Sequence, residues 1–155
     1  MKTLIFDLDE TVIDSKHRTP YFSNGDLDLA SYKAMQTHKN IFKDTLLPLA
    51  KIMKREYKAG KTIIILTARE MTKSDYHFLK FHNLKSHLIL SRNNIESGHF
   101  NLTDSEYKLK HLKIANIDIK NAIMYDDNRK VKSVLRKHGL TVQCAIKINK
   151  KLGKI

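Results

Sequence analysis

The chain has 155 residues, of which 41% are hydrophobic, and its 29 Lys and Arg residues outnumber its 16 Asp and Glu residues to give a formal net charge of +13. This length suits a single domain with a substantial core. No apolar run approaches the roughly 20 residues that a membrane span requires. Cys144 is the only cysteine, which excludes an internal disulfide and a metal cage built from thiolates. Acidic side chains occur within the first ten residues, where a signal peptide would be basic and then apolar, so we expect a cytoplasmic protein.

The strong positive charge favours a polyanionic partner, because a net charge of this size attracts anions over long distances. Nucleic acid is the natural candidate. The alternative is that the lysines, which are spread along most of the chain, reflect the codon usage of an A+T-rich genome. The charge therefore indicates a class of partner without locating a binding surface.

Two carboxylates follow the first predicted strand. The apolar run of residues 3–6 ends in Asp7 and Asp9, with Leu8 between them. In an extended chain, alternate side chains point to the same face, so the two acids can share one side at the carboxyl end of the strand. One carboxylate could attack phosphorus while the other protonates the leaving oxygen. The alternative is a strand that ends in a solvated acidic turn.

Residues 14–40 have no regular period and contain turn signals at Pro20 and at Asn24-Gly25. We expect an insertion that lies over the end of the first strand, too short to be a separate cap domain. It contains Arg18, a candidate ligand for a phosphate group. The alternative for Arg18 is a solvated arginine beside other basic residues.

A second strand end carries a hydroxyl and a guanidinium. Apolar residues at helical spacing between Leu46 and Tyr57 predict a helix that ends at Gly60. Residues 61–66 then form a strand buried on both faces, which stops at Thr67 and Arg69. Thr67 could donate a hydrogen bond to a phosphoryl oxygen and Arg69 could bind one with two parallel bonds. Either residue could instead simply begin a turn.

Residues 72–82 are predicted to form a helix and residues 87–90 a short strand, followed by a polar loop over residues 91–102 that could touch a substrate. Thr103, with Glu106 three residues later, predicts the start of another helix. Lys108 lies in the second turn of that helix, where a cation gains nothing from the helix dipole. An external anionic partner would explain Lys108 better, although it could be one lysine among many.

A third core strand, residues 121–125, ends in Asp126 and Asp127. These carboxylates, joined by Asp7 and by a backbone carbonyl, would make an oxygen-rich site for a hard cation such as Mg²⁺. An Asp-Asp pair after a strand can also be only a helix cap. A helix up to Gly139 and a strand over residues 141–146 follow, and residues 147–155 look like a basic tail.

Four motifs in this order resemble the haloacid dehalogenase superfamily of phosphotransferases, on the residues Asp7, Asp9, Thr67, Lys108, Asp126 and Asp127. The resemblance extends to the 3′-phosphatase domain of bacteriophage-type polynucleotide kinase/phosphatase. It rests on Arg18-x-Pro20-Tyr21, on Thr67-Ala68-Arg69-Glu70, which is similar to the S-G-R-E of that family, and on Asp104-x-x-x-Lys108.

The resemblance implies an α/β, Rossmann-like three-layer fold with a central parallel sheet over residues 1–146, interrupted by a minimal cap insertion at residues 14–40. It implies a Mg²⁺-dependent phosphomonoesterase that forms an aspartyl-phosphate. In that enzyme Asp7, Asp9, Thr67 and Lys108 would be catalytic, and Arg18, Arg69, Thr67 and Lys108 would bind substrate. Asp104 would support Lys108, and Asp7, Asp9, Asp126 and Asp127 would hold the metal.

The expected substrate is a 3′-phosphate at a DNA or RNA end, which would make the chain a polynucleotide 3′-phosphatase. The alternatives are a 5′(3′)-nucleotidase that acts on free nucleotides and a non-catalytic nucleic-acid-binding module. The sequence also departs from the family: Glu10 replaces a glycine and Thr67 replaces a serine. The phosphate-binding loop of a kinase is absent from the sequence, so no kinase activity is expected.

Overall fold

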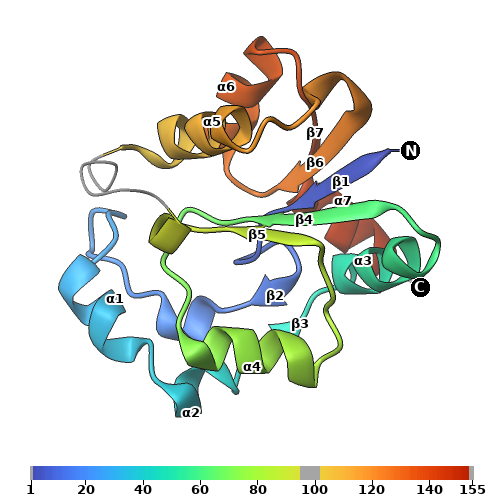
Figure 1. Ribbon diagram of the computed structural model, residues 1–155. Coiled ribbons are helices and arrows are strands. Elements are labelled where there is room, and N and C mark those ends of the chain that lie inside the picture. Colours follow the sequence, from blue (N-terminus) through green and yellow to red (C-terminus); the bar gives the residue numbers. More distant parts are fainter. Residues whose placement is uncertain (1, 95–101, 154–155) are drawn as a thin grey trace.

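A five-stranded parallel sheet forms the centre of the protein (Figure 1). The computed structural model describes residues 2–94 and 102–153. The strand order is β5-β4-β1-β6-β7, which places the first strand in the middle. The strands are β1 (Thr3–Phe6), β4 (Thr62–Leu66), β5 (Leu88–Leu90), β6 (Ala122–Asp126) and β7 (Thr141–Cys144).

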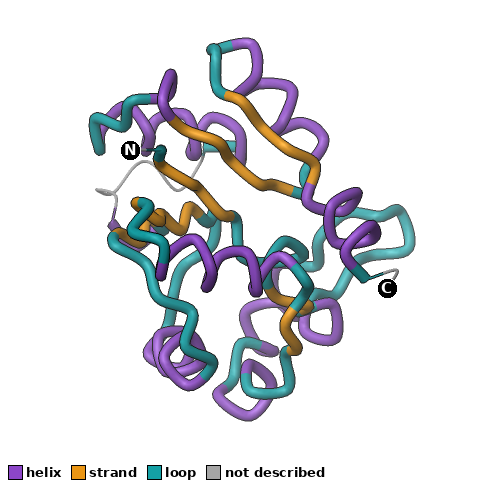
Figure 2. The backbone as a smooth tube through the Cα atoms, turned by 90° about the vertical axis from the view of Figure 1, so that its right-hand side faces the viewer, coloured by secondary structure: helices purple, strands orange, loops and turns teal. Residues whose placement is uncertain are grey.

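Helices cover both faces of this sheet, and Figure 2 shows strands between layers of helices. One face is covered by α3 (Leu49–Lys58), α4 (Lys73–Phe81) and α7 (Ala145–Leu152), and the other by α5 (Asp104–Ile114) and α6 (Arg129–Lys137). The buried side chains of β1 alternate between two cores, because Leu4 and Phe6 pack in the first and Ile5 packs in the second. The predicted α/β architecture with a central parallel sheet is confirmed. None of the helices in residues 2–94 and 102–153 is both long and apolar enough to cross a membrane.

The strand register brings the polar residues that follow β1, β4 and β6 to one edge. Phe6 is paired with Ile65 on one side and with Tyr125 on the other. Asp7 continues this pairing by donating its backbone N–H to the carbonyl oxygen of Tyr125 at 3.0 Å. The carboxyl ends of parallel strands in an open sheet are where ligands bind, and here that edge carries Asp7, Thr67 and Asp126.

The segment between β1 and α3 forms a small layer at this edge. A two-stranded antiparallel pair, β2 (Ile13–Asp14) with β3 (Thr45–Leu46), closes its base. Between these strands lie the 3-10 helix η1 (Lys16–Arg18) and the helices α1 (Leu29–Met35) and α2 (His38–Ile41). Further 3-10 helices are η2 (Arg92–Asn94) and η4 (Ile119–Asn121).

The sequence-based boundaries need three corrections. The strand predicted over residues 141–146 ends at Cys144, and α7 starts at Ala145. Residues 147–152 are not a tail, because they continue α7, in which Ala145 is buried and Ile148 packs against the first core. The Asn149 side chain also accepts a hydrogen bond from the backbone N–H of Leu49 at 2.8 Å. Leu46, predicted to belong to a helix, lies in β3, and that helix starts at Leu49 after Pro48.

Candidate active site

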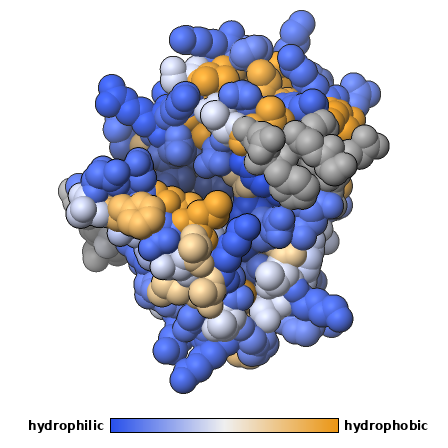
Figure 3. All heavy atoms as spheres, turned by 90° about the vertical axis from the view of Figure 1, so that its left-hand side faces the viewer, coloured by the Kyte–Doolittle hydropathy of each residue, from blue (hydrophilic) through white to orange (hydrophobic). Residues whose placement is uncertain are grey.

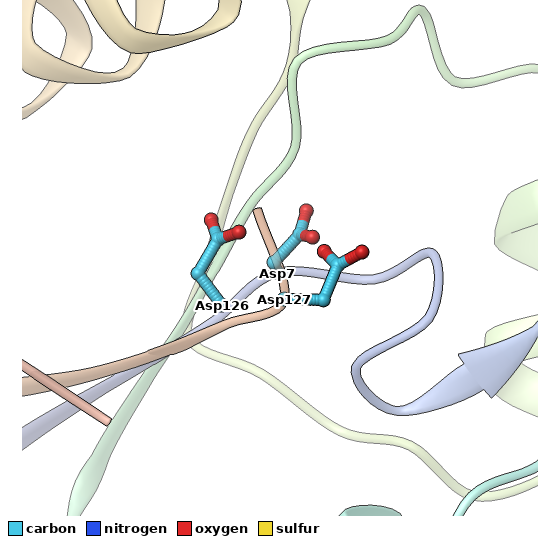
Figure 4. A group of neighbouring side chains, drawn as sticks. All are labelled: Asp7, Asp126 and Asp127. Atoms are coloured by element: carbon cyan, nitrogen blue, oxygen red, sulfur yellow. The ribbon is translucent and has the colours of Figure 1, made fainter. Parts of the chain in front are cut away.

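Three carboxylates meet at the carboxyl edge of the sheet. Asp7 follows β1, while Asp126 ends β6 and Asp127 comes next in the chain. One oxygen from each side chain lies within 4.8 Å of the others. Figure 4 shows Asp7 between the two other acids, with all three carboxylates pointing to the same side. The predicted convergence of Asp7 with Asp126 and Asp127 is therefore present in the structure.

Lys108 neutralises part of this acidic cluster from the neighbouring helix α5. Its Nζ lies 2.6 Å from Oδ2 of Asp126 and 3.1 Å from Oδ1 of Asp7. Only 3% of Lys108 is exposed. Burial alone would lower the pKa of Lys108, but the charges of Asp7 and Asp126 raise it, so the side chain stays a cation. The sequence pointed to an external anion as the partner of Lys108, but Asp7 and Asp126 of the protein itself are its anionic partners in this structure.

The cluster still has an excess of negative charge. Burial raises the pKa of Asp7 well above its usual value, and the charges of Asp126 and Asp127 raise it further against the opposing effect of Lys108. Burial also raises the pKa of Asp127. One lysine cannot balance three carboxylates, so an added cation would stabilise their ionised forms. The charge and the oxygen ligands fit a hard divalent ion such as Mg²⁺.

Asp9 is held apart from this cluster by a different set of partners. Leu8 accepts backbone hydrogen bonds from residues 11, 12 and 13, so the chain turns sharply after β1. The Asp9 carboxylate accepts from Nε of Arg69 at 2.6 Å and from the hydroxyl of Ser15 at 2.9 Å. Burial raises the pKa of Asp9, but Arg69 and Arg18 outweigh this effect and lower it. The Asp9 carboxylate is therefore occupied by Arg69 and Ser15, and a contribution of Asp9 to the predicted metal site would have to come from its backbone carbonyl.

Glu10 shows how the chain accommodates the residue that replaces a glycine. Its φ of 61° lies in the left-handed region, which glycine adopts more readily than other residues. The Glu10 carboxylate accepts a hydrogen bond from the backbone N–H of Ser15 at 3.0 Å. This bond fixes the turn after β1 and offsets part of the backbone strain.

A buried network of ions lies beneath Asp9. Arg18 is 1% exposed and donates from Nε and Nη2 to Asp44, with the shortest of these bonds at 2.6 Å. Arg18 also donates to Gln36. Arg69 joins the same network through an ion pair with Asp75 at 3.0 Å. Direct phosphate binding by Arg18 finds no support here, because almost none of its surface is accessible; the contacts support a positioning role instead.

Thr67 and Asp104 have different surroundings. Thr67 is buried at the end of β4, and its backbone N–H donates to the Leu90 carbonyl at 2.9 Å. Asp104, expected to orient Lys108, forms an ion pair with Arg92 at 3.2 Å, and the Arg92 guanidinium lies 4.6 Å from the ring centroid of Tyr107. Asp7 and Asp126 are the residues that orient Lys108.

The predicted substrate loop, residues 91–102, lies largely outside the described residues.

Sequence reasoning missed Asp44 and Asp75. Asp75 had one visible signal, since Thr72 and Asp75 form a capping box at the start of α4, but this signal predicts a cap and not an arginine partner. Asp44 is only 4% exposed and lies between a short helix and a short strand, where no periodic pattern marks it. Asp44 holds Arg18 from a distant part of the sequence, whereas Asp75 holds Arg69 from only six residues earlier.

We expect Mg²⁺ to raise the melting temperature of the protein. At ten times its dissociation constant, a bound ion stabilises the fold by about 1.4 kcal/mol, which is about 3 to 6 °C for a chain of this size. Differential scanning fluorimetry with MgCl₂ against NaCl of equal ionic strength measures the shift. The Asp127→Asn variant should show a smaller shift, and equal shifts in the two proteins would contradict the assignment of this cation site.

The sequence matches one family model along nearly its whole length. Residues 1–154 match the model described as bacteriophage T5 5′-deoxynucleotidase. The chain belongs to this family. A 5′-deoxynucleotidase of Escherichia phage T5 is 46% identical over 88 residues, which is 54% of this chain and 36% of that protein. The match thus spans little more than a third of the relative's length.

Solved structures with this fold include haloacid dehalogenase-type proteins. A chain of the Pnkp1/Rnl/Hen1 complex superposes with a TM-score of 0.67 at 23% identity, covering 92% of this chain and 45% of that one. A haloacid dehalogenase-like family hydrolase from Streptococcus pneumoniae superposes with a TM-score of 0.67 at 14% identity, covering 97% and 91%. The Rossmann-like haloacid dehalogenase fold expected from the motifs is thereby confirmed.

Proposed function

We propose that this protein is a Mg²⁺-dependent phosphomonoesterase that hydrolyses deoxynucleoside 5′-monophosphates through an aspartyl-phosphate on Asp7. The observation that carries the proposal is the meeting of Asp7, Asp126 and Asp127 within 4.8 Å, with Lys108 bonded to two of them. Membership in a family described as a 5′-deoxynucleotidase supports the choice of substrate. This substrate was the alternative in the sequence analysis and now takes first place.

In the first step, Oδ of Asp7 attacks phosphorus and the bond to the leaving oxygen breaks. Asp9 gives its proton to that oxygen, which leaves as the nucleoside hydroxyl. Arg69 and Arg18 lower the pKa of free Asp9, whereas an incoming phosphate dianion adds negative charge nearby and favours its protonation. Thr67 and Lys108 stabilise the negative charge on the transferred phosphoryl oxygens.

In the second step, water attacks the aspartyl-phosphate and Asp9 accepts its proton. The bond between phosphorus and Asp7 breaks, which regenerates the carboxylate and releases inorganic phosphate. Asp7, Asp126 and Asp127 would hold Mg²⁺, which when bound supplies positive charge that offsets the repulsion between these acids and the phosphate. The buried arginine network keeps Asp9 oriented during both steps.

A second candidate substrate is a 3′-phosphate at a DNA or RNA end. The net charge of +13 favours this reading, because cationic surfaces bind the phosphate backbone. The non-catalytic nucleic-acid-binding module is disfavoured, since a module of that kind has no need for three buried or half-buried carboxylates around one lysine.

Comparing two substrates at two salt concentrations separates these candidates. We expect a deoxynucleoside 5′-monophosphate to be hydrolysed more efficiently than a 3′-phosphorylated oligonucleotide, with little change between about 50 and about 200 mM salt. An oligonucleotide held through about three backbone phosphates would lose affinity roughly 20-fold over that interval. Preferred, strongly salt-dependent hydrolysis of the oligonucleotide would instead establish the 3′-phosphatase, and EDTA should stop either reaction.

A further inference from the structure

The insertion after β1 exposes several large apolar side chains within nine residues. Tyr21 is 64% exposed, Phe22 54%, Leu27 41% and Leu29 55%. An isolated antiparallel bridge joins Tyr21 to Leu27, and Asp28 donates its backbone N–H to the Pro20 carbonyl at 3.0 Å. Residues 20–28 therefore form a tied turn, which we call the aromatic hairpin. Exposure of this much apolar surface on an ordered turn calls for a contact that covers it.

The aromatic hairpin lies on the side of the molecule to which the strands deliver the acids. In Figure 1 the chain enters β1 and β4 from the right, so their carboxyl ends lie to the left, where α1 and the aromatic hairpin are drawn. Figure 3 looks onto this side and shows a hollow with hydrophilic walls and hydrophobic side chains along its border. The apolar surface thus adjoins the opening of a polar site.

Tyr21 itself lies within electrostatic reach of that site. Burial of part of the side chain raises its pKa, and the charges of Glu10, Asp127 and Asp9 raise it further. These charge contributions agree with the position of the aromatic hairpin on the side of the molecule to which the strands deliver the acids.

A second tyrosine of the insertion, Tyr32, lies in α1. Burial raises the pKa of Tyr32 to about 12, with Arg69 and Arg18 opposing and Asp9 adding to the rise. Tyr32 is half-buried, and its backbone carbonyl accepts from Gln36, whose side chain also contacts Arg18. The insertion thus carries one exposed and one half-buried tyrosine, and Gln36 links the backbone of Tyr32 to Arg18, whose Nη2 lies 3.8 Å from Oδ1 of Asp9.

The chemistry of Asp9 decides which part of the substrate meets these rings. Asp9 protonates the leaving oxygen, so the leaving group must lie on the Asp9 side of phosphorus. For a nucleotide that leaving group is a nucleoside, whose base offers a flat π-face. Stacking of a base on an aromatic side chain is tolerant of base identity and contributes measurably to affinity.

We propose that the aromatic hairpin and α1 form a nucleoside-binding subsite in which the Tyr21 ring, supported by Leu27, stacks on the base of the leaving group. The subsite assigns a role to the insertion and rests on the proposed function. Tyr21 and Leu27 face each other across the bridge and so share one face. Phe22, the next residue along the strand, projects to the other face and serves as a matched control.

Isothermal titration calorimetry tests this subsite without turnover, using Asp7→Asn protein with Mg²⁺ as the background. The two ligands are a deoxynucleoside 5′-monophosphate and 2-deoxyribose 5-phosphate, in which a hydroxyl replaces the base. Adding Tyr21→Ala should weaken binding of the nucleotide about tenfold and leave binding of the sugar phosphate unchanged. Tyr21→Phe should keep the affinity for the nucleotide, and Phe22→Ala should change it less than twofold.

Three results would overturn the subsite: equal weakening of both ligands by Tyr21→Ala, no weakening of either, or an equal effect of Phe22→Ala. Failure of the Asp7→Asn protein with an intact Tyr21 to bind the nucleotide more tightly than the sugar phosphate would also overturn it. These outcomes are separate from failure of the proposed function, which is an absence of phosphate release by wild-type protein. If the protein bound the nucleotide in this way but released no phosphate, the subsite would stand and the proposed phosphatase activity would be wrong.

Discussion

Asparagine in place of Asp7 should lower phosphate release from deoxynucleoside 5′-monophosphates by about 10⁴-fold or more, as loss of a catalytic nucleophile does. The amide has nearly the same shape but cannot form the aspartyl-phosphate. The variant should also melt at the same or a higher temperature, because burial among Asp126 and Asp127 raises the pKa of Asp7 and makes its charge unfavourable in the free protein. A colorimetric phosphate assay and thermal unfolding measure the two effects.

The matched control is Asp118→Asn, which changes an exposed carboxylate that caps η4. Asparagine also caps helices well, so this variant should keep both activity and stability. Turnover of the Asp7→Asn variant close to that of wild type would exclude Asp7 as the nucleophile. A large drop in its melting temperature would show that the loss of activity came from unfolding.

The largest effect on stability is expected for Asp44→Ala. This change leaves Arg18, which is 1% exposed, without the carboxylate that accepts from its Nε and Nη2. Breaking a buried ion pair by removing one partner costs about 3 to 5 kcal/mol. In a chain of this size, such a loss lowers the melting temperature by about 10 °C. Urea unfolding followed by circular dichroism gives the free energy directly.

Arg55→Ala is the control for Asp44→Ala because it removes an ion pair at an exposed position. Arg55 is 70% exposed at the side chain and pairs with Glu56 at 2.9 Å, and pairs of this kind contribute about 0 to 1 kcal/mol. If Asp44→Ala cost no more than Arg55→Ala, the Arg18 network would have no structural role. The positioning of Asp9 by that network would then lose its basis.

The fold and the acidic cluster could be predicted because short sequence patterns identify the strands, and the strands in turn determine which distant residues meet. Buried parallel strands appear as continuous apolar runs, and residues 3–6 and 62–66 have this pattern. Such strands deliver the residues after them to a common edge, so Asp7 and Asp126 could be expected to meet once β1 and β6 were neighbours. The start of α5 after Thr103 was equally visible, because its N-cap is a local feature.

The arginine network could not be predicted, because its pairs connect residues that no period links. Arg18 meets Asp44 only after the insertion folds back on itself, and Arg69 meets Asp9 from a different strand end.

The helix α7 was missed for another reason. Ala145, Ile148 and Leu152 have helical spacing, but the lysines among them suggested a solvated tail.

The most direct test of the account is a crystal structure of the protein with Mg²⁺ and beryllium trifluoride, which mimics a phosphoryl group on a carboxylate. The account predicts beryllium bonded to an Asp7 oxygen, with the metal ion coordinated by Asp7 and by at least one of Asp126 and Asp127. A beryllium adduct on another side chain, or a metal ion bound away from these three acids, would contradict it.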